Sequence, residues 1–105
     1  MNRRSRTIDL NDLRSRRDEI LRVAAAHGAE NVRVFGSVAR GDAVPTSDVD
    51  ILVDIPGDVG GFAYFGQMAD LQQALSSVIG VEVDVVDAAG LRTLRERILS
   101  EAIPL

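Results

Sequence analysis

The stretch Phe35-Gly36-Ser37, then ten residues, then Asp48-Val49-Asp50-Ile51-Leu52-Val53, decides the fold of this 105-residue chain. Its apolar runs predict a strand over Val32–Phe35 and a second strand over Val49–Val53. Because side chains alternate between the two faces of a strand, Asp48 and Asp50 should project from the same side, about 7 Å apart. Two carboxylates on one rigid edge suit a hard divalent cation such as Mg²⁺.

Gly36-Ser37 forms the predicted turn at the end of the first strand. Free backbone N–H groups and a hydroxyl at such a turn suit a phosphate group. We therefore predict that Gly36 and Ser37 bind phosphate, and that the chain performs phosphoryl chemistry on a nucleotide. Arg40 could contact the same phosphates, but a surface ion pair with Asp42 would explain it equally well.

The same residues resemble the active-site signature of the polymerase-β-like nucleotidyltransferases. The likeness rests on Phe35 to Gly41 and on Ser47 to Val53, and it extends from about Leu10 to Leu105. Because the chain is little more than this catalytic domain, it more narrowly resembles the minimal nucleotidyltransferase (MNT) antitoxins. The resemblance implies the α+β nucleotidyltransferase fold.

Apolar residues at helical spacing predict a first helix from about Leu10 to His27, which Asp9 or Asn11 would cap and Gly28 would end. One short helical turn should follow at residues 38–40. A second apolar stripe predicts a helix from about Phe62 to Ile79.

Val81–Val86 alternates cleanly and predicts a third strand. The long segment before it leaves room for a crossover helix, so the second and third strands should run parallel. Asp87 would then cap a last helix. The predicted fold class is α/β, with a three-stranded mixed sheet flanked by about four helices. We expect one domain over residues 1–105, with residues 1–9 as a flexible N-terminal arm.

Asp84 is the candidate for a third carboxylate, because it lies in the middle of the third strand and can face the same cleft as Asp48 and Asp50. Glu82, which shares its face, and Asp87, which lies on the opposite one, stay competitors for this role. Three carboxylates around two Mg²⁺ ions is an arrangement that displaces pyrophosphate from a nucleoside triphosphate. The resemblance also implies a third carboxylate on this strand. The predicted catalytic and metal-binding set is therefore Asp48, Asp50 and Asp84.

Composition bounds the remaining possibilities. A hydrophobic content of 46% supports a compact core, and with no cysteine the chain has no disulfide or thiolate metal site. No signal-peptide pattern or membrane-length apolar run is present, so we expect a cytoplasmic protein without a membrane partner. The net charge is −4, and residues 23–89 hold two arginines against ten acids. Direct nucleic-acid binding is therefore not expected.

The resemblance implies a function as well as a fold. It implies a type VII-like antitoxin that transfers AMP from ATP to a tyrosine of a HEPN ribonuclease toxin (AMPylation), with ATP as substrate and Mg²⁺ as cofactor. A homo- or hetero-oligomer would fit such a role. Two alternatives stay open: an antitoxin that neutralises its toxin by binding alone, and a nucleotidyltransferase of a small molecule such as an aminoglycoside.

Overall fold

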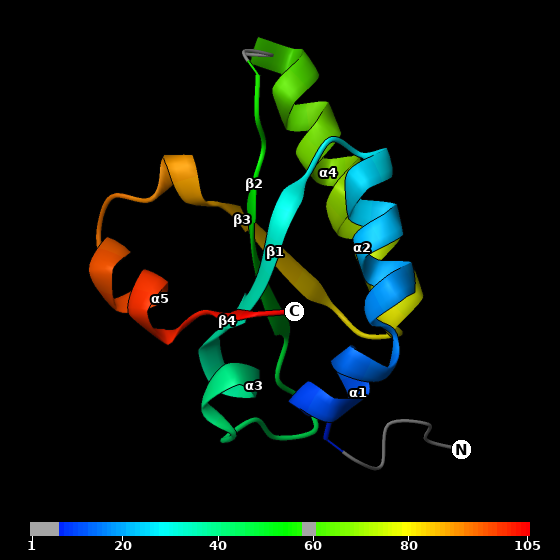
Figure 1. The fold of residues 1–105 in the computed structure, drawn as a ribbon, viewed down its shortest axis with the longest axis vertical. Coiled ribbons are helices and arrows are strands. Elements are labelled where there is room, and N and C mark those ends of the chain that lie inside the picture. Colours follow the sequence, from blue (N-terminus) through cyan, green and yellow to red (C-terminus); the bar gives the residue numbers. More distant parts are fainter. Residues whose placement is uncertain (1–6, 58–60) are drawn as a thin grey trace.

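The computed structural model describes residues 7–57 and 61–105. Its sheet has four strands in the order β3-β2-β1-β4, in which β2 and β3 are parallel and β1 is antiparallel to both of its neighbours (Figure 1). The predicted α+β architecture is confirmed. In chain order the elements are α1 (Leu10–Ser15), α2 (Arg17–Ala26), β1 (Glu30–Phe35), α3 (Gly36–Arg40), β2 (Val49–Asp54), α4 (Gly61–Ile79), β3 (Val83–Asp87), the 3₁₀ turn η1 (Ala88–Gly90), α5 (Arg95–Glu101) and β4 (Ile103–Pro104).

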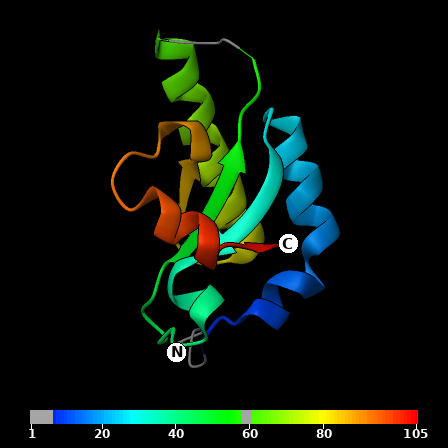
Figure 2. The same ribbon diagram turned by 60° about the vertical axis from the view of Figure 1, so that its left-hand side comes forward.

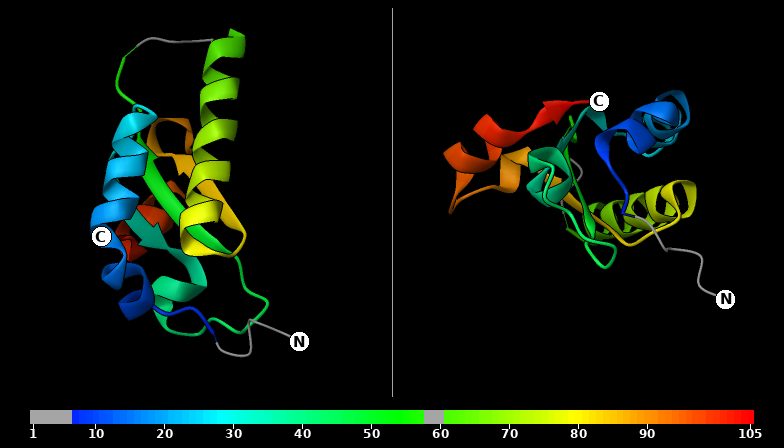
Figure 3. Two further views of the ribbon diagram at one scale, coloured as in Figure 1. Left: turned by 90° about the vertical axis from the view of Figure 1, so that its right-hand side faces the viewer. Right: turned by 90° about the horizontal axis from the view of Figure 1, so that it is seen from below.

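The sheet separates two unequal layers. Helices α2 and α4 pack side by side on one side of it, whereas α5 lies on the other (Figures 1 and 3). The core fills the first layer, where Ile20 of α2, Leu71 and Leu75 of α4, and Ile51 and Val53 of β2 are fully buried. Because this burial fixes one face of β2, the alternating residues of that strand must face the more open layer.

The predicted crossover is confirmed. Helix α4 connects β2 to β3, and the two strands pair in parallel with Asp50 opposite Asp84. The helix ends at Ile79, and Gly80 follows with φ of +88°. This left-handed conformation suits glycine and reverses the chain into β3.

The predicted first helix is wrong in one respect, because it is broken into α1 and α2 at Arg16. Arg16 has φ of −112° and ψ of 17°, outside the helical region. Two contacts stabilise the break: the Ser15 hydroxyl donates to the carbonyl of Asp12 (2.7 Å), and the Arg16 guanidinium donates to the carbonyl of Val78 at the end of α4 (2.6 Å). The second contact joins residues 62 apart in the sequence, which periodicity cannot reveal.

The C-terminal region also differs from the prediction. Asp87 caps η1 rather than a helix, because its carboxylate accepts from the N–H of Ala89 (3.1 Å). The last helix, α5, begins only at Arg95, after Leu94 with φ of +63°. Beyond it, Ile103–Pro104 forms β4 on β1, a fourth strand too short for its pattern to be recognised. Its proline is tolerated because β4 is an edge strand.

The N-terminal arm predicted over residues 1–9 lies mostly outside the described residues, which begin at Thr7. Ile8 packs against the core, and Asp9 caps α1. In the described part of the chain, no helix combines the length and the apolarity that crossing a membrane would need.

Asp9, and not Asn11, is the N-cap of α1. Its side chain accepts from the N–H of Asp12 (2.9 Å), and the Asp12 side chain accepts in return from the N–H of Asp9 (2.8 Å). We expect Asp9→Ala to lower the free energy of unfolding by about 1 kcal/mol, because the capping box is lost. Urea unfolding measures the change. Asn11→Ala is the matched control, and an equal loss in both variants would contradict the assignment.

Candidate active site

Three aspartates lie on the open face of the sheet. Asp48 directly precedes β2, Asp50 lies within it, and both alternate with the fully buried Val49 and Ile51. Asp84 is the partner of Asp50 in the parallel register, so their side chains leave the sheet on the same face. Asp48 and Asp84 are exposed and Asp50 is half-buried. The structure therefore brings the three predicted carboxylates to one face of two neighbouring strands.

The two alternatives for the third carboxylate lie at the two ends of β3, with Glu82 next to the Val49–Val83 pair and Asp87 opposite Val53. Glu82 precedes β3 and is exposed, and its backbone carbonyl accepts from the N–H of Val49 (3.0 Å). Asp87 is engaged at the far end of β3, where its carboxylate accepts from the hydroxyl of Tyr64 (2.7 Å). Asp84 is thus the acid of β3 that lies beside Asp50.

Asp50 is held in an unfavourable electrostatic environment. Burial, followed by the charges of Asp84 and Asp48, raises the pKa of Asp50 from 3.8 to about 6, and the attraction of Arg40 only partly offsets them. An added cation near these carboxylates would relieve both the burial cost and the repulsion. The raised pKa of Asp50 thus reports both its burial and the two neighbouring negative charges.

The donor chemistry of the three aspartates fits a hard cation, since each supplies carboxylate oxygens. However, within residues 7–57 and 61–105 no three acidic or histidine side chains are grouped closely enough to hold a metal ion. Binding would require their side chains to turn toward one another from adjacent backbone positions. Mg²⁺ ligation by Asp48, Asp50 and Asp84 stays a prediction.

Gly36 allows the turn between β1 and α3 to pass directly over Asp50. The residue is buried and has φ of +74°, and a Cβ built on it would collide with Oδ2 of Asp50. Glycine is therefore required here twice, once by its backbone conformation and once by the close approach of the carboxylate. Ser37 follows at the first turn of α3 and, with Gly36, borders the cavity next to Asp50.

The prediction of a free backbone N–H at this turn is wrong for Gly36. Its N–H donates to Oε2 of Glu101 (2.7 Å), and Nη1 of Arg40 donates to Oε1 of the same carboxylate (3.1 Å). Arg40 also pairs through Nε with Asp42 (3.2 Å). The predicted ion pair between Arg40 and Asp42 is thus present, but the carboxylate of Glu101 binds the same guanidinium.

A cavity of about 400 Å³ opens beside this turn. Helix α5 forms its second wall, and Figure 2 shows this helix next to α3. Sequence reasoning missed this wall, although Glu101 was visible as an acid within one turn of the apolar stripe through Leu94 and Ile98. The lining residues are Phe35, Gly36, Ser37, Arg40, Asp50, Leu94, Arg97, Ile98 and Glu101.

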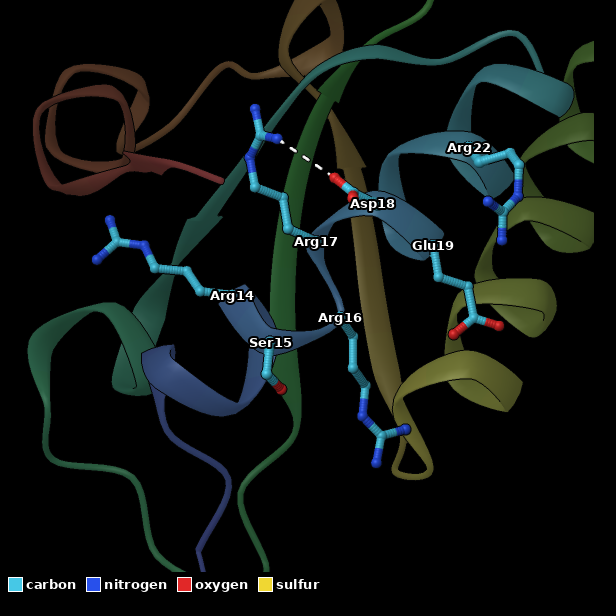
Figure 4. Close-up of a pocket in the computed structure, with 7 residues that line it drawn as sticks. All are labelled: Arg14, Ser15, Arg16, Arg17, Asp18, Glu19 and Arg22. Carbon is cyan, nitrogen blue, oxygen red and sulfur yellow. Dashed lines mark ion pairs between the residues drawn. The ribbon is translucent and has the colours of Figure 1, made fainter.

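A second hollow of about 400 Å³ lies over α1 and α2 and is shown in Figure 4. Two of its arginines are engaged with backbone carbonyls, Arg16 with Val78 and Arg17 with Leu105 (2.8 Å), and Arg17 also pairs with Asp18. Its remaining lining residues are Arg14, Ser15, Glu19 and Arg22. These contacts join the helices to the rest of the fold, and the hollow contains none of the three aspartates.

Comparison with known proteins identifies the family. Residues 17–105 match the model of the nucleotidyltransferase domain. This chain belongs to that family. It is 35% identical to the Methanocaldococcus jannaschii protein named "Putative protein adenylyltransferase MJ0435", over 81% of this chain and 88% of the relative. It is 32% identical to "Protein adenylyltransferase MntA" of Thermococcus cleftensis, over 82% of this chain and 92% of the relative.

Solved structures agree with this nucleotidyltransferase assignment. A structure described as a "putative minimal nucleotidyltransferase" is 47% identical and superposes with a TM-score of 0.78, covering 93% of this chain and 97% of the other. A toxin–antitoxin crystal structure with AMP-PNP has a TM-score of 0.68 at 22% identity, covering 90% of this chain and 72% of the other. The second likeness shows a shared fold.

The raised pKa of Asp50 predicts that Asp50→Asn stabilises the metal-free protein at pH 7.5. Wild-type Asp50 ionises there against burial and two like charges, whereas the amide stays neutral. Because the folded-state pKa lies above the ordinary value of 3.8, the penalty is absent below about pH 3.8, grows as the pH rises from there to about 6, and is constant above that pH. We expect the free energy of unfolding to rise by about 1 kcal/mol at pH 7.5. This is less than the full pKa shift would give, because water reaches the carboxylate.

Urea unfolding in EDTA between pH 4 and pH 8 measures this gain. Asp70→Asn, on the exposed surface of α4, is the control and should change stability little at any pH. A gain for Asp50→Asn that is the same at both ends of the pH range would show that ionisation of Asp50 is not its cause.

Proposed function

We propose that this nucleotidyltransferase transfers AMP from ATP to a tyrosine hydroxyl of a cognate HEPN ribonuclease toxin and thereby acts as an antitoxin. The observation that carries the proposal is the placement of Asp48, Asp50 and Asp84 on one open face, beside the Gly36-Ser37 turn. Membership of the nucleotidyltransferase family supports the reaction type, and the names of two relatives support a protein as acceptor.

Asp48, Asp50 and Asp84 would hold Mg²⁺, which when bound neutralises the triphosphate and stabilises the pyrophosphate that leaves. The raised pKa of Asp50 supports this role, since a group strained by neighbouring negative charges gains most from a cation. Ser37 and Arg40, which line the same cavity as Asp50, would contact the phosphates. In such reactions most of the rate comes from positioning and from charge stabilisation.

Asp84 is also suited to accept the proton of the acceptor hydroxyl, because its carboxylate is exposed next to Asp50. The hydroxyl oxygen then attacks the α-phosphorus and forms the new P–O bond. The bond from the α-phosphorus to the bridging oxygen breaks, and its electron pair leaves with pyrophosphate. The product carries AMP on the tyrosine as a phosphodiester.

An acceptor on another protein fits the exposure of the site. Asp48 and Asp84 are open to solvent, so the side chain of a bound protein can reach them. The likeness to a toxin–antitoxin crystal structure with AMP-PNP agrees with such a partner and with an adenine nucleotide. The partner is proposed to be the toxin encoded beside this chain.

Intact-mass spectrometry tests the reaction. The chain is incubated with ATP, Mg²⁺ and the neighbouring toxin, and we expect the toxin to gain one or more AMP units. Asp48→Asn combined with Asp50→Asn should lower the rate at least about a hundredfold, since the charge stabilisation is lost. Asp70→Asn should transfer AMP at the wild-type rate. An unchanged toxin mass at saturating ATP would refute the proposal.

Neutralisation by binding alone is the second candidate, and one observation favours it. Phe62 and Phe65 of α4 are 96% and 70% exposed, and Figure 3 shows the N-terminal end of α4 extending beyond α2. Exposed aromatic side chains of this kind are common in protein interfaces. If the double aspartate variant still protects cells from the toxin while Phe62→Ser with Phe65→Ser does not, binding is the function and catalysis is dispensable.

A further inference from the structure

Glu101 links the end of the chain to two groups of the candidate site. It is the last residue of α5, and its two carboxylate oxygens accept from the N–H of Gly36 (2.7 Å) and from Nη1 of Arg40 (3.1 Å). These partners lie 65 and 61 residues away in the sequence. The Glu101 side chain is 16% exposed, whereas that of Arg40 is 43% exposed. A mostly buried carboxylate therefore fixes a guanidinium that reaches solvent.

Glu101 is ionised at neutral pH. Burial acts to raise the pKa of its carboxyl, but the hydrogen bonds from Gly36 and Arg40, together with the charges of Arg40 and Arg97, outweigh burial and lower it. The pKa of Arg40 is raised in turn, first by its hydrogen bond to Glu101 and then by that to Asp42. The pair is therefore a charge-assisted hydrogen bond, the stronger and more directional kind.

We propose that Glu101 is a positioning residue of the nucleotide site, which orients Arg40 toward the triphosphate and holds the Gly36 turn over Asp50. The inference rests on the proposed function. Glu101 accepts a hydrogen bond from Nη1 of Arg40, and Asp42 accepts one from Nε. Within the described ranges 7–57 and 61–105, no hydrogen bond or ion pair involves Nη2 of Arg40. This nitrogen stays available to a phosphate oxygen at the cavity that Arg40 lines together with Ser37 and Asp50.

The opposite role would make Glu101 an internal competitor that occupies the phosphate-binding groups until ATP displaces it. The backbone around it argues against displacement. Ala102 follows directly and leads into β4, which pairs with β1 through Val34 and Ile103, and through Arg33 and Pro104. Rotating the Glu101 side chain away would break both of its hydrogen bonds, and the backbone that carries it is anchored by this pairing. Glu101 is therefore a fixed part of the wall.

Three variants test this role: Glu101→Gln, Glu101→Ala and Arg40→Ala. Glutamine keeps an oxygen for the N–H of Gly36 and loses the charge that orients Arg40. We expect Glu101→Gln to raise KM for ATP about tenfold with a smaller change in kcat, and Glu101→Ala to raise it further. Glu96→Gln, which removes an exposed carboxylate from the first turn of the same helix, is the control and should leave both constants unchanged.

The decisive measurement is the combination of Glu101→Gln with Arg40→Ala. If Glu101 acts through Arg40, the double variant should have the same KM for ATP as Arg40→Ala alone, whereas independent effects would multiply. Multiplying effects would overturn the proposal. A lower KM in Glu101→Ala would identify Glu101 as a competitor and would also overturn it. A lower melting temperature with an unchanged KM for ATP would show that Glu101 is only a structural contact. That result would also overturn the proposal.

Calorimetry of ATP binding in the presence of Mg²⁺ and without toxin separates this inference from the proposed function. If the wild type binds ATP and transfers nothing to the toxin, the proposed acceptor is wrong, and the same variants are then compared by Kd. The expected order is unchanged: Glu101→Gln weakens ATP binding about tenfold in the wild-type background and has no effect in Arg40→Ala. Equal ATP affinity of Glu101→Gln and the wild type would overturn the positioning role by itself.

Discussion

The candidate site depends on the parallel pairing of β2 with β3, which sets Asp50 directly beside Asp84. Side by side, the two carboxylates repel each other and contribute to the raised pKa of Asp50. The pairing persists because the other faces of these strands are apolar: Val49, Ile51 and Val83 are all buried. A slip of one residue would turn those side chains to solvent and drive aspartates into the core. Burial of apolar side chains on one face thus outweighs the charge repulsion on the other.

A second constraint acts on the same aspartate from the opposite direction. The turn at Gly36 approaches Asp50 so closely that no Cβ fits, and its N–H is bound by Glu101 on the other side. Three segments of the chain therefore meet at one glycine: the end of β1, the start of β2 and the end of α5. The site is assembled by backbone geometry more than by contacts among its own side chains.

Local pattern predicted those parts of the fold and site whose cause is local. The alternation around Asp48 and Asp50, the glycine turn and the crossover through α4 were all recognisable, because each follows from periodicity or from a residue's own conformational preference. The break at Arg16, the two-residue β4 and the contact of Glu101 with Gly36 were not, because each depends on a partner more than 60 residues away in the sequence. Contacts of that kind leave no periodic trace in one sequence.

The resulting site is asymmetric, and the asymmetry has a chemical consequence. On the β2–β3 side the carboxylates of Asp48 and Asp84 are exposed and form no salt bridge with residues 7–57 or 61–105, so this side attracts cations and leaves room for an acceptor. On the α3–α5 side the negative charge of Glu101 is already matched by Arg40. A triphosphate bound in the cavity beside Arg40 would meet a fixed guanidinium, whereas the aspartates would repel its phosphates until positive charge is added. Binding of nucleotide and of cation should therefore be coupled, because the cation cancels the repulsion between the aspartates and the phosphates.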